Sequence, residues 1–299
     1  MPPPLKMNGA LAQLLTSFRG RDIVVLLNRG NRGDGVIHLG GRQLLALLDL
    51  GYREVHETED LSHVQGEVLL IHGAGAMSRG THTLARLLNS VAPRFDEIVM
   101  LPGSFDTSEP AVRSFAATWN SKYSVFCREL VSFSALHEIG VKPKLLLLGH
   151  DLAFHNDLSS WAQRPAQGRA GLFRQDNEAA YGRLPRALDI YEDASYGTDR
   201  EPERLLDFVA RFEEIHTDRC HGAITGAMMG RQVVFYRNSY FKNQAIYHHS
   251  LAGMPHVRFV QRTPFSFAQF SRALYWGKVR PIEMKFRRLF QGRPAVAQG

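Results

Sequence analysis

Short apolar runs alternate with amphipathic stretches along the first half of the chain. The apolar runs predict buried strands at Asp22–Leu27, Glu67–Ile71, Glu97–Leu101, Tyr123–Phe126 and Lys144–Leu148. The amphipathic stretches predict helices, one following the loop Asn28–Asp34 and running through Leu48, and others at His82–Val91, Glu109–Trp119 and Glu129–Glu138. Strands joined by crossover helices are typical of a parallel sheet, so this half predicts an α/β, doubly wound domain.

A polar stretch, Asn156–Arg169, then interrupts the alternation and is the best candidate for a linker. Beyond it the pattern resumes, with strands predicted at Gly171–Arg174, Ala187–Tyr191, Glu214–Thr217 and Gln232–Tyr236, and helices at Glu201–Phe212 and Gly222–Met229. We therefore expect two α/β domains, residues 1–155 and 156–263, followed by a basic tail, residues 264–299.

The composition indicates in which cellular compartment the protein is found. The 299 residues include two cysteines, Cys127 and Cys220, which leaves no disulfide framework and favours a reducing compartment. The N-terminal segment lacks the basic region of a signal peptide, and no stretch approaches the roughly 20 apolar residues of a membrane span. A cytoplasmic protein is expected.

The net charge of +7 does not mark a nucleic-acid-binding face. From Arg258 onward there are nine Lys or Arg residues and a single acid, Glu283, so the basicity belongs to the tail. Nucleic-acid partners usually require basic residues spread over one folded surface. We expect no nucleic-acid partner.

Ligands of such sheets bind outside the carboxyl ends of the strands, so the loops that follow strands carry the functional information. In the loop Asn28–Asp34, two glycines precede a helix, which favours an anion; the alternative is a tight turn with Asp34 as N-cap. Arg128 ends another strand and is a candidate fork for carboxylate or phosphate. Its alternative is an ion pair with Glu129 or across the domains.

The second half has the denser set of candidate residues. Arg219 and His221 stand two residues apart at the predicted start of a helix, where a cation, an imidazole and free amides converge. A helix cap or a core position is the alternative for His221. Lys242 follows the next strand and could instead be solvated. The density of cations predicts an anionic substrate, and no cluster has convincing metal-ligand spacing.

Together the motifs resemble the polysaccharide pyruvyl transferase family, from about Asn28 to Leu251. They are Asn31, Gly33 and Asp34; the glycines Gly73 and Gly75; the LPGS segment ending at Ser104; Arg128, Glu129 and Ser132; Thr217–Gly222; and Lys242. The resemblance implies two Rossmann-like domains in a glycosyltransferase-B-like arrangement, with the active site in the cleft and a C-terminal helix crossing back. It also implies phosphoenolpyruvate as co-substrate, with no cofactor.

The resemblance also implies roles for individual residues. In the family, two arginines and a histidine serve the donor, which carries over onto Arg128, Arg219 and His221. We expect Lys242, Gly73, Gly75 and Ser104 to hold the donor together with them. The segment Phe173–Glu178 and the pair His248–His249 are not general features of the family. From their positions after strands, and not from the resemblance, we expect the acceptor to be held by Asn31, Gly33, Asp34, Arg174, Asp176, Asn177 and Glu178. His221 is the best candidate for the acid that protonates the methylene carbon, because imidazole holds a proton near neutral pH. Asp34, Asp176 and Glu178 are candidates for the base, and Asp34 is preferred because the acceptor should enter opposite the donor.

Two other functions fit the same pattern. A glycosyltransferase that uses a nucleotide sugar would share the architecture, and a sugar-binding or scaffold protein could descend from such an enzyme. The tail adds a further expectation: Ser266–Lys278 predicts the helix that crosses back, and Glu283–Phe290 places cations beside aromatic residues. That composition suits an anionic membrane surface, where a lipid-linked saccharide acceptor would be reached from the cytoplasmic side.

Overall fold

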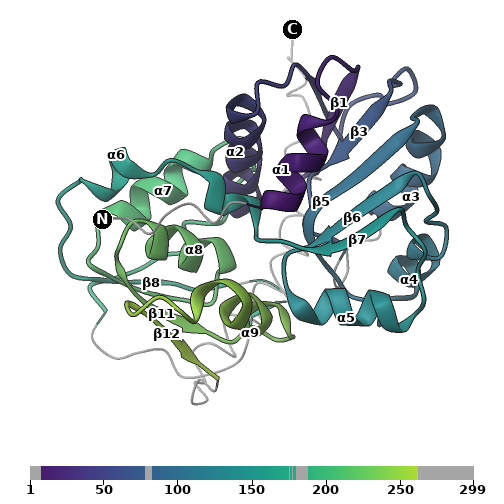
Figure 1. The fold of residues 1–299 in the computed structure, drawn as a ribbon. Coiled ribbons are helices and arrows are strands. Elements are labelled where there is room, and N and C mark those ends of the chain that lie inside the picture. The colour runs from purple at the N-terminus through teal and green to yellow at the C-terminus, as the bar shows by residue number, and fades with distance from the viewer. Residues whose placement is uncertain (1–7, 78–82, 175, 177, 180–187, 262–299) are drawn as a thin grey trace, which may run out of the picture.

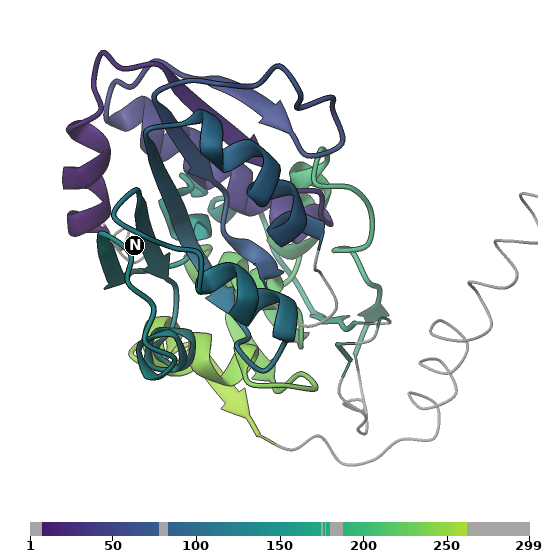
Figure 2. The same cartoon turned by 90° about the vertical axis from the view of Figure 1, so that its right-hand side faces the viewer.

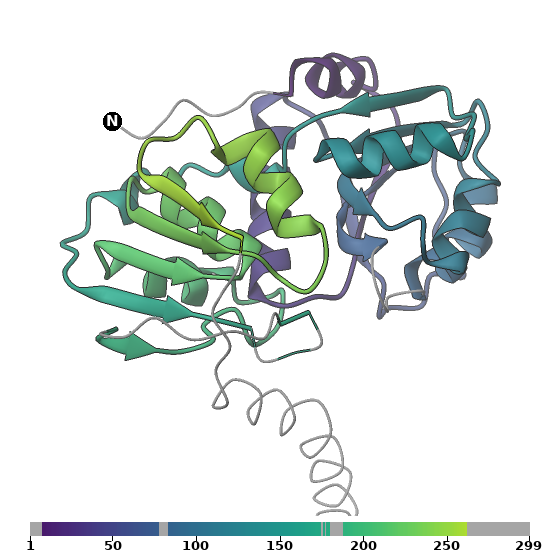
Figure 3. The ribbon, with the colours of Figure 1, turned by 90° about the horizontal axis from the view of Figure 1, so that it is seen from below.

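The structure, a computed structural model, describes residues 8–77, 83–174, 176, 178–179 and 188–261. Two parallel sheets, each covered by helices, lie side by side (Figures 1 and 3). We call the first sheet with its helices the first lobe, and the second sheet with its helices the second lobe. The predicted α/β class is confirmed.

The first sheet has the strand order β2-β1-β3-β5-β6-β7, and β4 pairs with β5 off this path. Its strands are β1 (Ile23–Leu27), β2 (Arg53–His56), β3 (Val68–Ile71), β4 (Ala74–Met77), β5 (Glu97–Phe105), β6 (Tyr123–Cys127) and β7 (Leu145–Leu148). Alternate residues of β1 enter different cores: Val24 and Leu26 pack in one, and Ile23, Val25 and Leu27 in the other. A strand that is buried on both faces reads as a continuous apolar run.

Helices supply both of these cores. On one face lie α1 (Gly9–Thr16) and α2 (Arg32–Leu47), and on the other lie α3 (Thr83–Val91), α4 (Pro110–Ala116) and α5 (Leu130–Glu138). Figure 2 shows the purple α1 and the blue helices on opposite sides of the strands. Sequence analysis missed α1, β2 and β4. The edge strand β2 reads Arg-Glu-Val-His and exposes its first two residues, so it lacks an apolar run.

The second sheet has the order β12-β11-β10-β8-β9, with all neighbours parallel. Its strands are β8 (Arg169–Leu172), β9 (Ile190–Tyr191), β10 (Glu214–Thr217), β11 (Gln232–Tyr236) and β12 (Val257–Val260). Its helices are α7 (Pro202–Ala210), α8 (Cys220–Met228), α9 (Lys242–Ile246) and the π-helix η3 (Tyr247–Leu251).

Several predicted boundaries in this lobe were wrong. The strand predicted at Gly171–Arg174 begins two residues earlier, because its register with β10 pairs Arg169 with Glu214. The helix predicted from Gly222 begins at Cys220. The strand predicted at Ala187–Tyr191 is observed as β9 alone, and residue 187 lies outside the described residues. The predicted tail helix at Ser266–Lys278 also lies outside them.

The two lobes meet along α2. Val36 of α2, together with Ala153 and Phe154 of the 3-10 helix η2 (Leu152–His155), belongs to the core of the second lobe. Glycines permit this approach: a Cβ at Gly35 would lie 2.3 Å from the Asp199 carbonyl oxygen. The predicted linker is not irregular throughout, since it contains the short helix α6 (Ser159–Ala162). Within the described part of the chain, no helix combines the length and apolar character needed to cross a membrane.

Candidate active site

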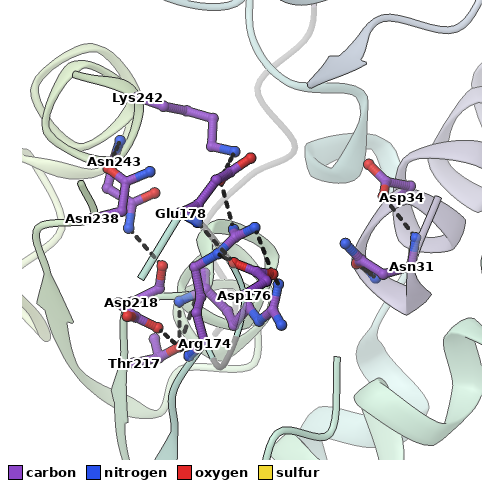
Figure 4. Close-up of polar contacts among 12 residues, drawn as sticks. Asn31, Asp34, Arg174, Asp176, Glu178, Thr217, Asp218, Asn238, Lys242 and Asn243 are labelled. Carbon is purple, nitrogen blue, oxygen red and sulfur yellow. Dashed lines mark hydrogen bonds and ion pairs between the residues drawn. The ribbon is translucent and has the colours of Figure 1, made fainter. Parts of the chain in front are cut away.

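A cavity of about 420 Å³ opens between the two lobes, at the carboxyl ends of strands from both sheets. It brings together nine of the predicted site residues: Asn31, Gly33, Asp34, Arg128, Arg174, Glu178, Arg219, His221 and Lys242. Figure 4 shows Asn31 and Asp34 across an open space from the group that contains Arg174, Glu178 and Lys242. The volume lies within the range of roughly 300 to 1,000 Å³ typical of small-molecule sites.

The loop before α2 forms one wall of the cavity. Asn31 is the N-cap of α2, its side chain accepting from the Gly33 amide at 2.7 Å. The Asp34 carboxylate accepts from the Asn31 amide at 2.8 Å, which completes a capping box. Asp34 is therefore the third residue of the helix and not the N-cap. The N-terminus of α2 borders the cavity, where its amides and dipole favour negative charge.

Arg128 enters the cavity from the first lobe, where β6 ends. Its Nη1 lies 2.7 Å from Oδ2 of Asp151, and its Nε donates to the Ser104 hydroxyl at 2.9 Å. Glu129 instead caps α5, accepting from the Ser132 amide at 2.9 Å, so the alternative pairing of Arg128 with Glu129 is wrong. Burial alone would raise the pKa of Asp151, but Arg128 and His221 beside it hold that pKa below its ordinary value.

Arg219 and His221 enter from the second lobe at the start of α8. Arg219 forms ion pairs with Asp193 at 2.5 Å and with Asp176 at 2.9 Å. His221 Nε2 lies 3.4 Å from Asp151 Oδ2 of the first lobe. A Cβ at Gly33 would lie 2.7 Å from Nδ1 of His221, so only glycine fits there. His221 is thus held between the two lobes, and not simply in the core of its own.

Lys242 and Arg174 converge on one carboxylate (Figure 4). Glu178 Oε2 lies 2.7 Å from Lys242 Nζ and 2.9 Å from Arg174 Nη1. Burial alone would raise the pKa of Glu178, but Lys242 and Arg174 lower it to about 2. Lys242 is buried, so the alternative that it is simply solvated is wrong.

Several residues predicted to bind ligand do not line the cavity. The Ser104 hydroxyl accepts from Arg128, and the Asp176 carboxylate accepts from both Arg174 and Arg219. Gly73 packs on backbone, since a Cβ there would lie 2.2 Å from the Pro102 carbonyl oxygen. Ser104 and Asp176 therefore hold arginines that line the cavity. Gly75 is part of β4. Asn177 lies outside the described residues.

Sequence analysis missed three acids of the site, Glu57, Asp151 and Asp193, and gave no role to Asp218 of the Thr217–Gly222 motif. Glu57 lines the cavity, while Asp151 and Asp193 hold the two arginines in place. Asp218 is buried and accepts from the Arg174 backbone amide at 2.7 Å, and burial raises its pKa to about 7. Asp218 directly follows the predicted strand Glu214–Thr217, and Asp151 comes three residues after the predicted strand Lys144–Leu148, positions that could have marked them.

Among the described residues, one cluster has the spacing to hold a metal ion: Asp151, Cys220 and His221, with ligand atoms within 4.8 Å of one another. The Asp151 carboxylate already forms an ion pair with Arg128. Burial raises the pKa of the Cys220 thiol to about 12, which disfavours the thiolate that a metal would need. This set suits proton transfer better than a divalent cation, and a metal-free site stays a prediction.

Comparisons with known proteins agree on the family. The family described as polysaccharide pyruvyl transferase matches residues 31–240. The chain is 32% identical over 85 residues to "Putative pyruvyl transferase EpsO" of Bacillus subtilis (strain 168), a stretch covering 28% of this chain and about a quarter, 25%, of that protein.

A solved structure supports the fold. It is a functionally uncharacterised protein from Klebsiella pneumoniae subsp. pneumoniae NTUH-K2044, 24% identical, with a TM-score of 0.70 over 85% of this chain and 98% of that one. The family match includes the capping loop of α2, Arg128, and the start of α8 with Arg219 and His221. The chain belongs to the polysaccharide pyruvyl transferase family.

Proposed function

We propose that this protein transfers pyruvyl from phosphoenolpyruvate to two hydroxyl groups of a saccharide, forming a pyruvate ketal and releasing phosphate. One observation carries the proposal: Arg128 of the first lobe and Arg219, His221 and Lys242 of the second border the same cavity. Phosphoenolpyruvate presents a carboxylate and a phosphate on one small molecule. Guanidinium groups bind both of these anions through paired donors.

His221 would act as the acid. Ketal formation begins when the methylene carbon of the enol gains a proton, which makes the adjacent carbon electrophilic. His221 lies at the start of α8 with its Nε2 3.4 Å from Oδ2 of Asp151, which orients the ring at the wall of the cavity.

The cations that line the donor side are held in place before any ligand arrives. Arg128 pairs with Asp151, Arg219 with Asp193, and Lys242 with Glu178. These pairs fix the donor groups, so little reorganisation is needed when an anion binds. The acids neutralise part of the positive charge. The cavity would therefore not bind the donor, or the phosphate that is released, too tightly for the phosphate to leave.

The acceptor side would be the loop before α2, on the wall opposite the donor residues. We further propose a lipid-linked saccharide as acceptor and a glycosyltransferase-B-like arrangement of the two lobes, in the cytoplasm at the inner face of the membrane. In that arrangement, binding of phosphoenolpyruvate would draw the lobes together through Arg128 and Arg219.

Ligand-dependent thermal unfolding tests the donor. Phosphoenolpyruvate should raise the melting temperature of the wild type, and this shift should vanish in Arg219→Ala and shrink in Arg128→Ala. Arg113→Ala is the matched control, because Arg113 is exposed on α4. If a nucleotide sugar raises the melting temperature and phosphoenolpyruvate does not, a glycosyltransferase replaces this proposal. If a saccharide raises the melting temperature and neither phosphoenolpyruvate nor a nucleotide sugar does, the protein is a sugar-binding protein.

Product analysis tests the reaction. Mass spectrometry of the polysaccharide from a strain that lacks this chain should show the loss of pyruvate ketals. Complementation with the wild-type chain should restore them, and complementation with His221→Ala should not. An unchanged polymer in the deletion strain would contradict the proposed function.

A further inference from the structure

Three carboxylates border the cavity among the described residues: Asp34, Glu57 and Glu178. The attacking hydroxyl of a saccharide must lose its proton, and a carboxylate at this wall is the group that can take it. The three differ in what already binds them. Those differences decide which one remains available as a base.

Glu178 and Asp34 already serve the structure. Glu178 lies 2.7 Å from Lys242 and 2.9 Å from Arg174, and these two cations lower its pKa to about 2. A carboxylate so stabilised in its charged form is a weak base. Asp34 accepts from the Asn31 amide at 2.8 Å and closes the capping box of α2. Its carboxylate also fills the space beside Gly30, where a Cβ would lie 2.2 Å from Asp34 Oδ2.

Glu57 has neither of these roles. It directly follows β2, and its backbone amide donates to the Leu27 carbonyl at 2.9 Å, which continues the pairing of β2 with β1. The side chain is partly buried at the cavity wall. Burial raises the pKa of Glu57, and that effect exceeds the opposing effect of a hydrogen bond from the Arg29 backbone amide. A partly desolvated carboxylate of this kind accepts a proton readily.

Asp199 of the second lobe holds this wall in position. Its Oδ2 lies 3.1 Å from Nε2 of His56, the residue before Glu57, and its Oδ1 accepts from the Gly30 amide at 3.4 Å. One carboxylate therefore ties both the end of β2 and the loop before α2 to the second lobe. The charged and titratable groups that act on Glu57 are Arg29, His56 and Asp199.

We propose that Glu57 is the general base that activates the acceptor hydroxyl, an inference that rests on the proposed function. His221 gives its proton to the methylene carbon of the enol. The hydroxyl oxygen forms a bond to the adjacent carbon, and its proton passes to Glu57. The product of this step is a tetrahedral adduct that still carries phosphate.

In the second step the bond between that carbon and the phosphate oxygen breaks, and phosphate leaves with the bonding pair. The second hydroxyl attacks the same carbon, and neutral His221 takes its proton, which restores the imidazolium. Glu57 then releases its proton to solvent. The proton of the second hydroxyl thus replaces the one that His221 gave to the methylene carbon. The proton of the first hydroxyl leaves through Glu57, so the atoms balance.

Steady-state kinetics of full-length variants test this assignment. Glu57→Gln should lower turnover by roughly a hundredfold or more, the usual range for a lost general base. Its affinity for phosphoenolpyruvate should stay at the wild-type value, and the acidic limb of the pH profile of turnover should disappear. Glu57→Asp should recover part of the activity. Glu59→Gln, an exposed neighbour, should match the wild type.

Asp34→Asn supplies the discriminating comparison. This variant weakens the capping box, yet it should retain the acidic limb because Glu57 is intact. If Glu57→Gln keeps near wild-type turnover, or if Asp34→Asn and not Glu57→Gln abolishes the limb, the assignment to Glu57 is wrong while the proposed function stands. If the wild type transfers no pyruvyl from phosphoenolpyruvate, the proposed function fails and the assignment fails with it.

Discussion

Nη1 of Arg128 lies 2.7 Å from Oδ2 of Asp151, and both side chains are 1% exposed. The same Asp151 oxygen lies 3.4 Å from Nε2 of His221, which belongs to the other lobe. One buried carboxylate thus sets the position of a donor-binding arginine and of the proposed acid. Its removal would leave the Arg128 charge buried without a partner, which is far more costly than the loss of an exposed ion pair.

Asp151→Asn should therefore lower the free energy of unfolding by about 3 to 5 kcal/mol, measured by urea denaturation. Because its folded pKa lies below the unfolded value of roughly 3.9, the stabilisation from Asp151 is present above that pH and is lost as the pH falls further. Asp207→Asn removes the exposed pair with Arg164 and should cost less than about 1 kcal/mol. Equal losses in the two variants would contradict the role given to Asp151.

His221→Ala should lower turnover by roughly a hundredfold or more, because it removes the proposed acid. The variant should remain folded, since the ring borders an open cavity. His137→Ala, on the exposed surface of α5, is the control and should keep full activity. A folded His221→Ala protein with near wild-type turnover would remove His221 from the mechanism.

Asp218→Asn should change how stability depends on pH. The folded pKa of Asp218 is about 7, above its unfolded value of roughly 3.9, so this group stabilises the fold least when it is charged. Stability from Asp218 falls as the pH rises from about 4 to 7, by up to roughly 1.4 kcal/mol per pH unit.

Urea denaturation at pH 5 and pH 7 measures this difference. Relative to the wild type, Asp218→Asn should gain roughly 2 to 3 kcal/mol over that interval. Other titrating groups are common to both proteins and cancel in the comparison. Parallel stability curves for the two proteins would show that Asp218 titrates at its ordinary pKa.

The basic tail should bind anionic membranes. Residues 283–290 carry Lys285, Arg287 and Arg288 beside aromatic residues, and lie outside the described part of the structure. Each cation near such a surface adds about 1 kcal/mol, so four or five in the tail would give reversible, salt-sensitive binding. Full-length protein should sediment with anionic vesicles at low salt, and truncation after Pro281 or high salt should weaken this. If the full-length protein does not sediment with anionic vesicles even at low ionic strength, the tail does not bind membranes.

The sequence alone identified the strands that are buried on both faces, and several residues at their ends. Burial on two sides requires a continuous apolar run, so β1, β3 and β5 are visible without any tertiary information. Functional residues of a parallel sheet follow its strands, which is why Arg128 and Arg219 were found from their positions. The edge strand β2 has no such run, and Glu57, which follows it, was missed with it.

Only the tertiary structure decided which partner each of these residues has. The contact of Gly33 with His221, and the sharing of Asp151 between Arg128 and His221, join segments of both lobes. Such pairings depend on strand order and on how α2 docks against the second lobe, and neither leaves a periodic signal in the chain. Charge state depends on the same packing: Glu57 and Glu178 are the same residue type, but burial raises one pKa while two neighbouring cations lower the other.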